Sequence, residues 1–146
     1  MMHHGNELSE AVLLHFTDTH LLQDSSAVLR GANTSASLDR VVELAKSTSL
    51  NPDAIVITGD IAEDGSAGAY QSLLRSLNSF EVPIRWVPGN HDNPTAMEAV
   101  AGLNGKISNE RGNWIEIILK NKTFPIMVTF SPSYLIRFPE NKRHSW

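Results

Sequence analysis

Short, nearly continuous apolar runs recur in the N-terminal part of the chain. They cover residues 11–16, 53–58 and 84–87, and each is followed by polar side chains. Strands that are buried on both faces of a sheet show such continuous hydrophobicity, whereas half-exposed strands alternate between apolar and polar residues. We therefore predict three buried β-strands at these positions.

Segments with helical spacing of apolar side chains separate these strands. Capping residues at 33–37 lead into a predicted helix over 35–49. In 67–80 the apolar positions follow i, i+3, i+4 and i+7, the spacing of one helix face (Tyr70, Leu73, Leu74, Leu77). A third helix is predicted to open at 93–98, with Pro94 near its first turn. This alternation of strands and helices predicts an α/β fold, with a mostly parallel sheet, flanking helices and right-handed crossovers.

The pattern changes in the C-terminal part of the chain. Residues 114–119 are typical of a strand, 126–130 form a weaker apolar stretch, and 131–146 show no clear period. At 146 residues, with 41% hydrophobic and 19% charged residues, the chain has the size and composition of one globular domain. No run of about 18 apolar residues occurs, so no membrane span is expected.

Cysteine usage and charge limit the classes of function. The chain has no cysteine, which excludes disulfides, thiolate metal sites and a cysteine nucleophile. Its N-terminus lacks the basic and apolar regions of a secretory signal. The lack of cysteine and the lack of such a signal both favour a cytoplasmic protein. The formal charge is −4 and the Lys and Arg residues are scattered, so duplex nucleic acid is not an expected partner. A small phosphate ester stays compatible with this charge if bound cations neutralise it.

Polar side chains with metal-binding chemistry follow all three predicted strands. Asp18 and His20 follow the first strand, Asp60 ends the second, and Asn90 and His91 come after the third. Residues two apart in a strand point to the same side, so Asp18 and His20 are expected to aim at one point. The carboxyl ends of parallel strands meet at one edge of a sheet, where ligands bind. The sequence thus predicts that these five side chains gather there.

Each of these residues alone has a simpler explanation. Asp18 is typical of a turn or a helix cap, and Gly59-Asp60 is typical of a turn that ends a strand. A single histidine such as His20 or His91 is more often an ordinary surface or core residue than a ligand. Independent turns, however, have no reason to carry metal-binding side chains at three strand ends, so their joint placement favours a site.

The residue types suit a pair of divalent cations that act on a phosphate ester. Asp60 can bridge two cations, Asp18 and His20 complete one side, and the amide oxygen of Asn90 serves the second cation. Mixed oxygen and imidazole ligands favour manganese, iron or zinc over calcium. The expected nucleophile is a metal-bound hydroxide, and His91 would stabilise developing charge or protonate the leaving oxygen. Asp92 has two possible roles, which are to orient the ring of His91 or to cap the next helix.

The same motifs resemble those of a known family. Asp18-x-His20, Gly59-Asp60 and Gly89-Asn90-His91-Asp92, in this order on strand ends, resemble the calcineurin-like metallophosphoesterases. Within that superfamily, the stretches FTDTHLL, TGDIAEDGSAGAY and WVPGNHDNPTAM are similar to class III cyclic nucleotide phosphodiesterases, the bacterial 3′,5′-cyclic AMP hydrolases. The resemblance implies a dinuclear metal enzyme of the αββα sandwich fold, of which this chain supplies the N-terminal half.

The resemblance also assigns roles by position. It implies metal ligands at Asp18, His20, Asp60 and Asn90, and contacts to the substrate phosphate from His20, Asp60, Asn90 and His91. The family uses two divalent ions together with a later histidine and a Gly-His-x-His motif. The only histidine after His91 is His144, so the resemblance implies that one ion or none is retained here.

Family-like sequence ends near Leu119, which leads to a hypothesis about the domain boundary. We expect a phosphoesterase half-domain at 1–119 and a divergent tail at 120–146, with a disrupted reading frame near Lys120 as its origin. A half-domain would expose the inner face of its sheet. The expected function is hydrolysis of cyclic AMP or a related cyclic nucleotide. The alternatives are an inactive remnant with an incomplete metal site, and a phosphomonoesterase or nuclease of the same superfamily. The oligomeric state stays open.

Overall fold

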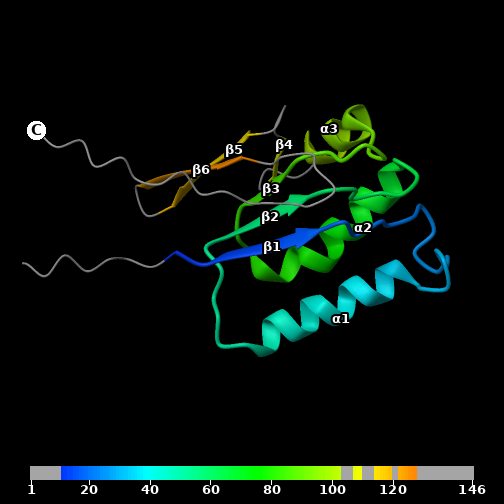
Figure 1. The fold of residues 1–146 in the computed structure, drawn as a ribbon. Coiled ribbons are helices and arrows are strands. Elements are labelled where there is room, and N and C mark those ends of the chain that lie inside the picture. Colours follow the sequence, from blue (N-terminus) through cyan, green and yellow to red (C-terminus); the bar gives the residue numbers. More distant parts are fainter. Residues whose placement is uncertain (1–10, 103–106, 110–113, 120–121, 128–146) are drawn as a thin grey trace, which may run out of the picture.

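The computed structural model describes residues 11–102, 107–109, 114–119 and 122–127. Within these ranges, strands and helices alternate along the chain until the last two strands (Figure 1). The elements are β1 (Leu13–Thr17), α1 (Thr34–Ser47), β2 (Ala54–Thr58), α2 (Ala67–Leu77), the 3-10 helix η1 (Asn78–Phe80), β3 (Ile84–Trp86), α3 (Pro94–Gly102), β4 (Ile107–Asn109), β5 (Trp114–Leu119) and β6 (Lys122–Met127).

The main sheet is parallel throughout, in the order β1-β2-β3-β4. Thr17 of β1 pairs with Thr58 of β2, and Ile57 pairs with Trp86 of β3, so the three carboxyl ends lie nearly level. The α/β fold with a parallel sheet and flanking helices is thereby confirmed. Strand β4 escaped sequence analysis because three residues are too few to show a period.

Strands β5 and β6 form a separate antiparallel pair. The strand predicted at 114–119 is confirmed with the same bounds. The weaker apolar stretch at 126–130 lies partly in β6, and its remainder, like the segment 131–146, falls outside the described residues.

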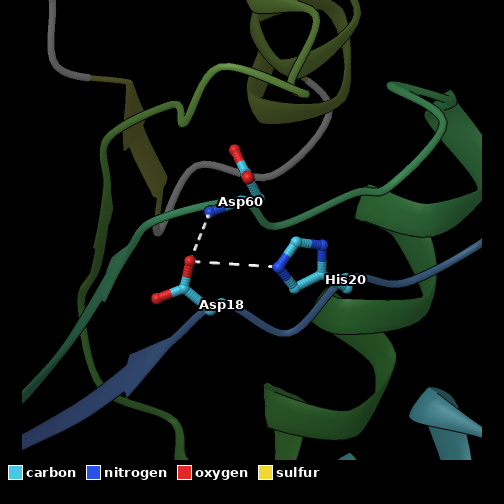
Figure 2. A group of neighbouring side chains, drawn as sticks. All are labelled: Asp18, His20 and Asp60. Atoms are coloured by element: carbon cyan, nitrogen blue, oxygen red, sulfur yellow. Dashed lines mark hydrogen bonds and ion pairs between the residues drawn. The ribbon is translucent and has the colours of Figure 1, made fainter. Parts of the chain in front are cut away.

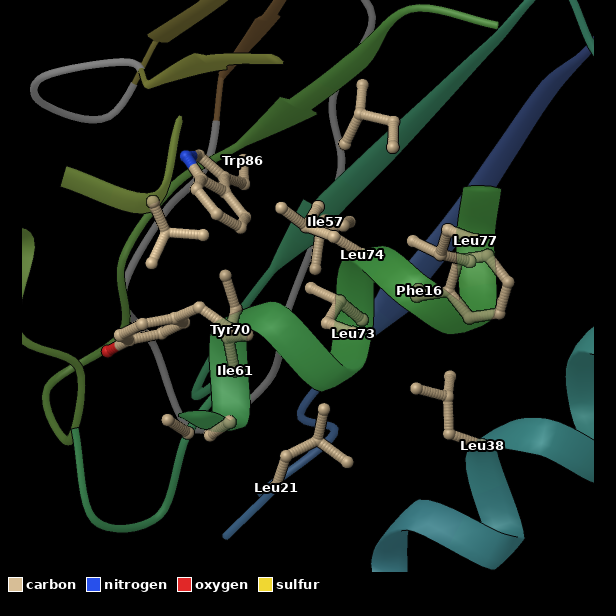
Figure 3. Packing of buried hydrophobic residues seen from close by; sticks show 14 of the residues in the cluster. Phe16, Leu21, Leu38, Ile57, Ile61, Tyr70, Leu73, Leu74, Leu77 and Trp86 are labelled. Atoms are coloured by element: carbon tan, nitrogen blue, oxygen red, sulfur yellow. The ribbon is translucent and has the colours of Figure 1, made fainter. Parts of the chain in front are cut away.

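The core lies between the main sheet and its helices, and α2 contributes most to it (Figure 3). Tyr70, Leu73 and Leu77 of α2 are 0–1% exposed, as their predicted common helix face requires. From α1 only Leu38 and Val42 are buried. Truncating a fully buried leucine such as Leu73 to alanine would cost about 2–5 kcal/mol, because the cavity adds to the lost burial.

The three predicted strands differ in burial. All five residues of β2 are buried, in agreement with their continuous hydrophobicity. For β1 the prediction of a fully buried strand is wrong, because His15 and Thr17 are exposed while Phe16 is buried. Successive residues of a strand point to opposite faces, so Phe16 packs into the core while the face that carries His15 and Thr17 is exposed.

The helix starts follow from side-chain caps. Asn33 accepts a hydrogen bond from the Ala36 amide at 2.7 Å, and Ser66 accepts one from the Ala69 amide at 3.3 Å. These caps satisfy free amides of the first turn, and α1 and α2 begin within one residue of the predicted positions. In the part of the chain that the structure describes, no helix combines the length and hydrophobicity that a membrane crossing needs.

Candidate metal centre

Asp18, His20 and Asp60 converge at the carboxyl edge of the sheet. Each offers one ligand atom, and these atoms all lie within 4.8 Å of one another (Figure 2). Nε2 of His20 is 4.0 Å from Oδ1 of Asp18, and the same carboxylate oxygen accepts a hydrogen bond from the Asp60 amide at 3.2 Å. The predicted convergence of the first two strand ends is therefore confirmed.

The reason predicted for the common direction of Asp18 and His20 was wrong. Strand β1 ends at Thr17, so the two-residue alternation of a strand does not orient Asp18 and His20. Both have left-handed backbones, with φ of 52° and 43°. Their loop follows the loop after β2, because the His20 amide donates to the Asp60 carbonyl at 3.0 Å. Backbone pairing of two loops brings the three side chains together.

Two glycines let the carboxylates lie directly against the backbone. A Cβ on Gly59, which has φ of +70°, would be 2.5 Å from Oδ1 of Asp18. A Cβ on Gly89 would collide with Oδ1 of Asp60. Both positions therefore exclude side chains, and the glycines of the two motifs serve close approach as well as turning.

Glu63 lies between the two histidines of the site, and sequence analysis did not single it out. Its Oε2 is 2.7 Å from Nδ1 of His20 and 3.6 Å from Nδ1 of His91. The hydrogen-bond network assigns the Nδ1 proton of His20 to this contact, which leaves Nε2 as the free lone pair on the side of Asp18. In the sequence Glu63 is marked only by its place three residues after Asp60, and acidic residues are common in such loops.

The loop after β3 is hydrogen-bonded to Asp60 and Glu63. The His91 amide donates to Oδ1 of Asp60 at 3.0 Å, and Nδ1 of His91 is 3.2 Å from the Glu63 carbonyl. A carbonyl only accepts, so Nδ1 carries the proton and Nε2 faces away from this contact. Asn90, the residue before His91, is exposed. Its role as a ligand stays a prediction.

Asp92 binds backbone amides and a tyrosine. Its carboxylate accepts hydrogen bonds from the amides of Ile61, Ala62 and Gly89 and from the Tyr70 hydroxyl, at 2.8–3.0 Å. The pKa of Tyr70 is raised, first by burial and then by the negative charge of Asp92. Asp92 thus ties the loop after β2 to the loop after β3.

Neither of the two predicted roles of Asp92 describes these contacts. The side chain that caps α3 is Asn93, whose Oδ1 accepts from the amides of Thr95 and Ala96. The described contacts of the His91 ring are with Glu63 and, edge to face, with the ring of His20, whose centroid is 6.0 Å away. The placement of Asp92 is that of a residue that fixes the two loops, while its place among the catalytic residues stays a prediction.

A comparison with known families gives a match along most of the chain. A family model described as calcineurin-like phosphoesterase matches residues 11–140. The chain belongs to the calcineurin-like phosphoesterase family. The family is one of metallophosphoesterases, which are hydrolases, and the fold of this chain agrees with the N-terminal half of the family fold.

Curated relatives of this calcineurin-like phosphoesterase are named cyclic nucleotide phosphodiesterases. The 3′,5′-cyclic-nucleotide phosphodiesterase alr5338 of Nostoc sp. is 34% identical over 120 residues, which are 80% of this chain and 45% of the relative. The 3′,5′-cyclic adenosine monophosphate phosphodiesterase CpdA of Escherichia coli is 42% identical over 58% of this chain and 31% of the relative. The protein of the same name from Pseudomonas aeruginosa is 31% identical over 87% of this chain and 46% of the relative. The chain spans less than half the length of these relatives.

The donor set of the calcineurin-like phosphoesterase fits the divalent metals that its family implies. Two carboxylates and one imidazole supply hard oxygen and borderline nitrogen ligands, which suit manganese, iron or zinc. The ring of His20 is also held by Glu63 through its other nitrogen, as is usual for metal-binding histidines. The domain boundary at 119 stays a prediction, and the family match itself continues to residue 140.

Proposed function

We propose that these residues form one part of the active site of a metal-dependent phosphodiesterase that hydrolyses 3′,5′-cyclic AMP or a related cyclic nucleotide. The observation that carries this proposal is the convergence of the ligand atoms of Asp18, His20 and Asp60 within 4.8 Å. The names of the curated relatives support the substrate class.

The proposed ligands divide between two cations. Asp18 and His20 would hold the first cation, Asp60 would bridge both, and Asn90 would serve the second. Divalent cations at such a site lower the pKa of water and offset the charge of a phosphodiester. Since the chain itself carries a net charge of −4, this compensation matters for binding an anion.

His91 is proposed to face the substrate. Its Nδ1 is engaged by the Glu63 carbonyl at 3.2 Å, which leaves Nε2 for the phosphate or the leaving oxygen. The Glu63 carboxylate, whose Oε2 is 3.6 Å from the same nitrogen, helps to hold the ring in this direction. His20, Asp60 and Asn90 would share the contact with the phosphate, and Asp92 would position the loop that carries His91.

A second candidate is a remnant with an incomplete metal site. It is favoured by the described residues themselves, among which the group of possible carboxylate and imidazole ligands has three members, Asp18, His20 and Asp60, while Asn90 is exposed. Such a protein would bind one cation or none and would not turn over substrate. A phosphomonoesterase or nuclease of the same superfamily would keep the metals and change the substrate.

Hydrolysis assays with the purified chain separate these candidates. We expect manganese-dependent hydrolysis of cyclic AMP that Asp60→Asn abolishes and that Asp39→Asn, which changes an exposed carboxylate on α1, leaves intact. Hydrolysis of p-nitrophenyl phosphate alone would favour a phosphomonoesterase. A folded protein that binds manganese without any hydrolysis would favour the remnant, and hydrolysis that survives both chelation and Asp60→Asn would contradict the proposed site.

A further inference from the structure

A line of polar side chains runs across the ends of β1 and β2 and reaches Asp18. Nε2 of His15 is 2.8 Å from Oγ1 of Thr58. The Thr58 hydroxyl is 3.4 Å from Oγ1 of Thr17, and the Thr17 hydroxyl donates to Oδ2 of Asp18 at 2.5 Å. None of His15, Thr17 and Thr58 belongs to the proposed metal centre, yet their line ends on one of its ligands.

The direction of hydrogen-bond donation along this line follows from its end. An ionised carboxylate only accepts, so the one hydroxyl proton of Thr17 goes to Asp18. The Thr17 oxygen is then free to accept from Thr58, whose own oxygen accepts from the imidazole. His15 must therefore carry its proton on Nε2. All donors point toward Asp18, and such aligned bonds reinforce one another.

The ionisation of His15 is consistent with this direction. Although the residue is exposed as a whole, partial burial of its ring lowers its pKa, against the opposing effect of the Asp18 charge. The neutral ring exists in two tautomers, and the contact with Thr58 selects the one with the proton on Nε2.

The line of bonds divides the two oxygens of Asp18 between two tasks. Oδ2 is held by Thr17, while Oδ1 lies 4.0 Å from Nε2 of His20 and accepts from the Asp60 amide. The side chain of Asp18 starts from a left-handed backbone with φ of 52°, a conformation that its surroundings must stabilise. Holding Oδ2 fixes the rotation of the carboxylate and hence the direction of Oδ1.

We propose that Thr17, Thr58 and His15 are positioning residues that orient the carboxylate of Asp18 for a divalent cation. The inference rests on the proposed function, in which Asp18 is a metal ligand. The contact of 3.4 Å between the two threonines is long for a hydroxyl pair, so the coupling weakens there. The expected order of effects is therefore Thr17 first, Thr58 second and His15 third.

A purely structural role for these bonds would be to tie β1 to β2. The two roles differ in what a substitution changes. His15, Thr17 and Asp18 line one groove of about 360 Å³ beside β1, so changes at 15 and 17 do not open the buried core. A structural role predicts a loss of stability with unchanged metal affinity. A positioning role predicts a loss of metal affinity at nearly unchanged stability.

The experiment measures manganese affinity by titration calorimetry and metal-free stability by thermal unfolding, both on the full chain. We expect Thr17→Val to weaken manganese binding about 10-fold, the lower end for loss of a residue that supports a metal ligand. Thr17→Ser keeps the hydroxyl and should bind manganese with nearly the affinity of the wild type. Thr58→Val and His15→Phe should weaken binding by successively smaller factors. The matched control is Thr48→Val, which removes a hydroxyl bonded to the Ala45 carbonyl at the far end of α1.

The outcomes separate this inference from the proposed function. If the wild-type chain binds manganese and Thr17→Val binds it within about twofold of wild type, the positioning role is overturned. If the wild-type chain does not bind manganese, the proposed function fails, and the line of bonds is tested by proton–nitrogen correlation NMR of His15. If His15 carries its proton on Nε2 in the wild type and on Nδ1 in Thr58→Val, the direction of hydrogen bonding from His15 to Asp18 is supported. If the wild type already carries the proton on Nδ1, this direction is overturned.

Discussion

Two carboxylates at the edge of the sheet bind different kinds of group. Asp92 binds three backbone amides and Tyr70, and we call this group the backbone tie. Glu63 binds the rings of His20 and His91, and we call this group the imidazole tie. The first fixes the path of two loops, and the second fixes the direction of two rings.

This difference shows that position in a motif does not decide the role of an acidic residue. Asp92 belongs to the GNHD stretch and yet contacts mainly the backbone. Glu63 lies outside the two-residue Gly59-Asp60 motif and contacts both histidines of the candidate site. We therefore expect the backbone tie to contribute mainly to stability and the imidazole tie mainly to metal binding.

The largest expected effect comes from breaking the backbone tie. Asp92→Ala would leave three amides and the buried Tyr70 hydroxyl without their acceptor, which should cost about 3–5 kcal/mol of folding free energy. Urea denaturation measures this loss. Glu43→Ala, which removes an exposed carboxylate on α1, should change stability by less than about 0.5 kcal/mol. Equal losses in Asp92→Ala and Glu43→Ala would show that the bonds of the backbone tie do not stabilise the fold.

A smaller effect is expected from filling the space beneath Asp18. A methyl group at Gly59→Ala would meet the Asp18 carboxylate at 2.5 Å in a left-handed backbone, so we expect manganese affinity to fall at least about 10-fold. Gly31→Ala, at φ of +88° with open space around it, carries only the backbone strain of about 1 kcal/mol. Gly102→Ala meets no atom and should be neutral.

Calorimetric titration of the three glycine variants distinguishes clash from strain. Manganese affinity should fall in Gly59→Ala alone, while stability should fall in both Gly59→Ala and Gly31→Ala. A loss of affinity in Gly31→Ala equal to that in Gly59→Ala would mean that general strain, and not the contact with Asp18, controls the site.

Breaking the imidazole tie should affect metal binding more than stability. Glu63→Gln keeps the size of the side chain and weakens its hold on the Nδ1 proton of His20, so we expect about a 10-fold loss of manganese affinity. Its effect on stability should stay below about 1 kcal/mol, since the carboxylate is partly exposed. Glu43→Gln on the exposed face of α1 is the matched control. A loss of stability without a loss of affinity would assign Glu63 to the fold.

The smallest expected effect is a pH dependence from His15. Burial lowers its pKa from about 6.5, so the folded state binds fewer protons than the unfolded state at and below that pH. Its contribution to stability is present above pH 6.5 and is lost as the pH falls toward the lowered pKa. His15→Gln should therefore lose less stability than wild type between about pH 7.5 and about pH 5.5. Parallel denaturation curves over this range would contradict the assigned direction.

Much of the fold could be predicted because its determinants are local. The continuous hydrophobicity of β2, the caps at Asn33 and Ser66, and the apolar face of α2 each act within a few residues of the chain. The exposed face of β1 could not be predicted, since an apolar run does not reveal whether both faces of its strand are covered.

The candidate site was predictable in its residues and less so in its construction. The carboxyl ends of parallel strands must meet, which brought Asp18, His20 and Asp60 together in the prediction and in the structure. Apart from the bond between Asp92 and the Gly89 amide, the contacts of Glu63 and Asp92 join positions 22 to 43 residues apart, and no periodicity encodes such pairs. Only the folded chain reveals which acidic residue serves the rings and which serves the backbone.

The central claim is that Asp18, His20 and Asp60 bind a divalent cation, and anomalous X-ray diffraction from crystals grown with manganese tests it most directly. We expect an anomalous peak bounded by a carboxylate oxygen of Asp18, Nε2 of His20 and a carboxylate oxygen of Asp60. The peak should disappear in Asp60→Asn crystals grown under the same conditions. Well-ordered side chains at these three positions without an anomalous peak, or a peak only at other residues, would contradict the claim.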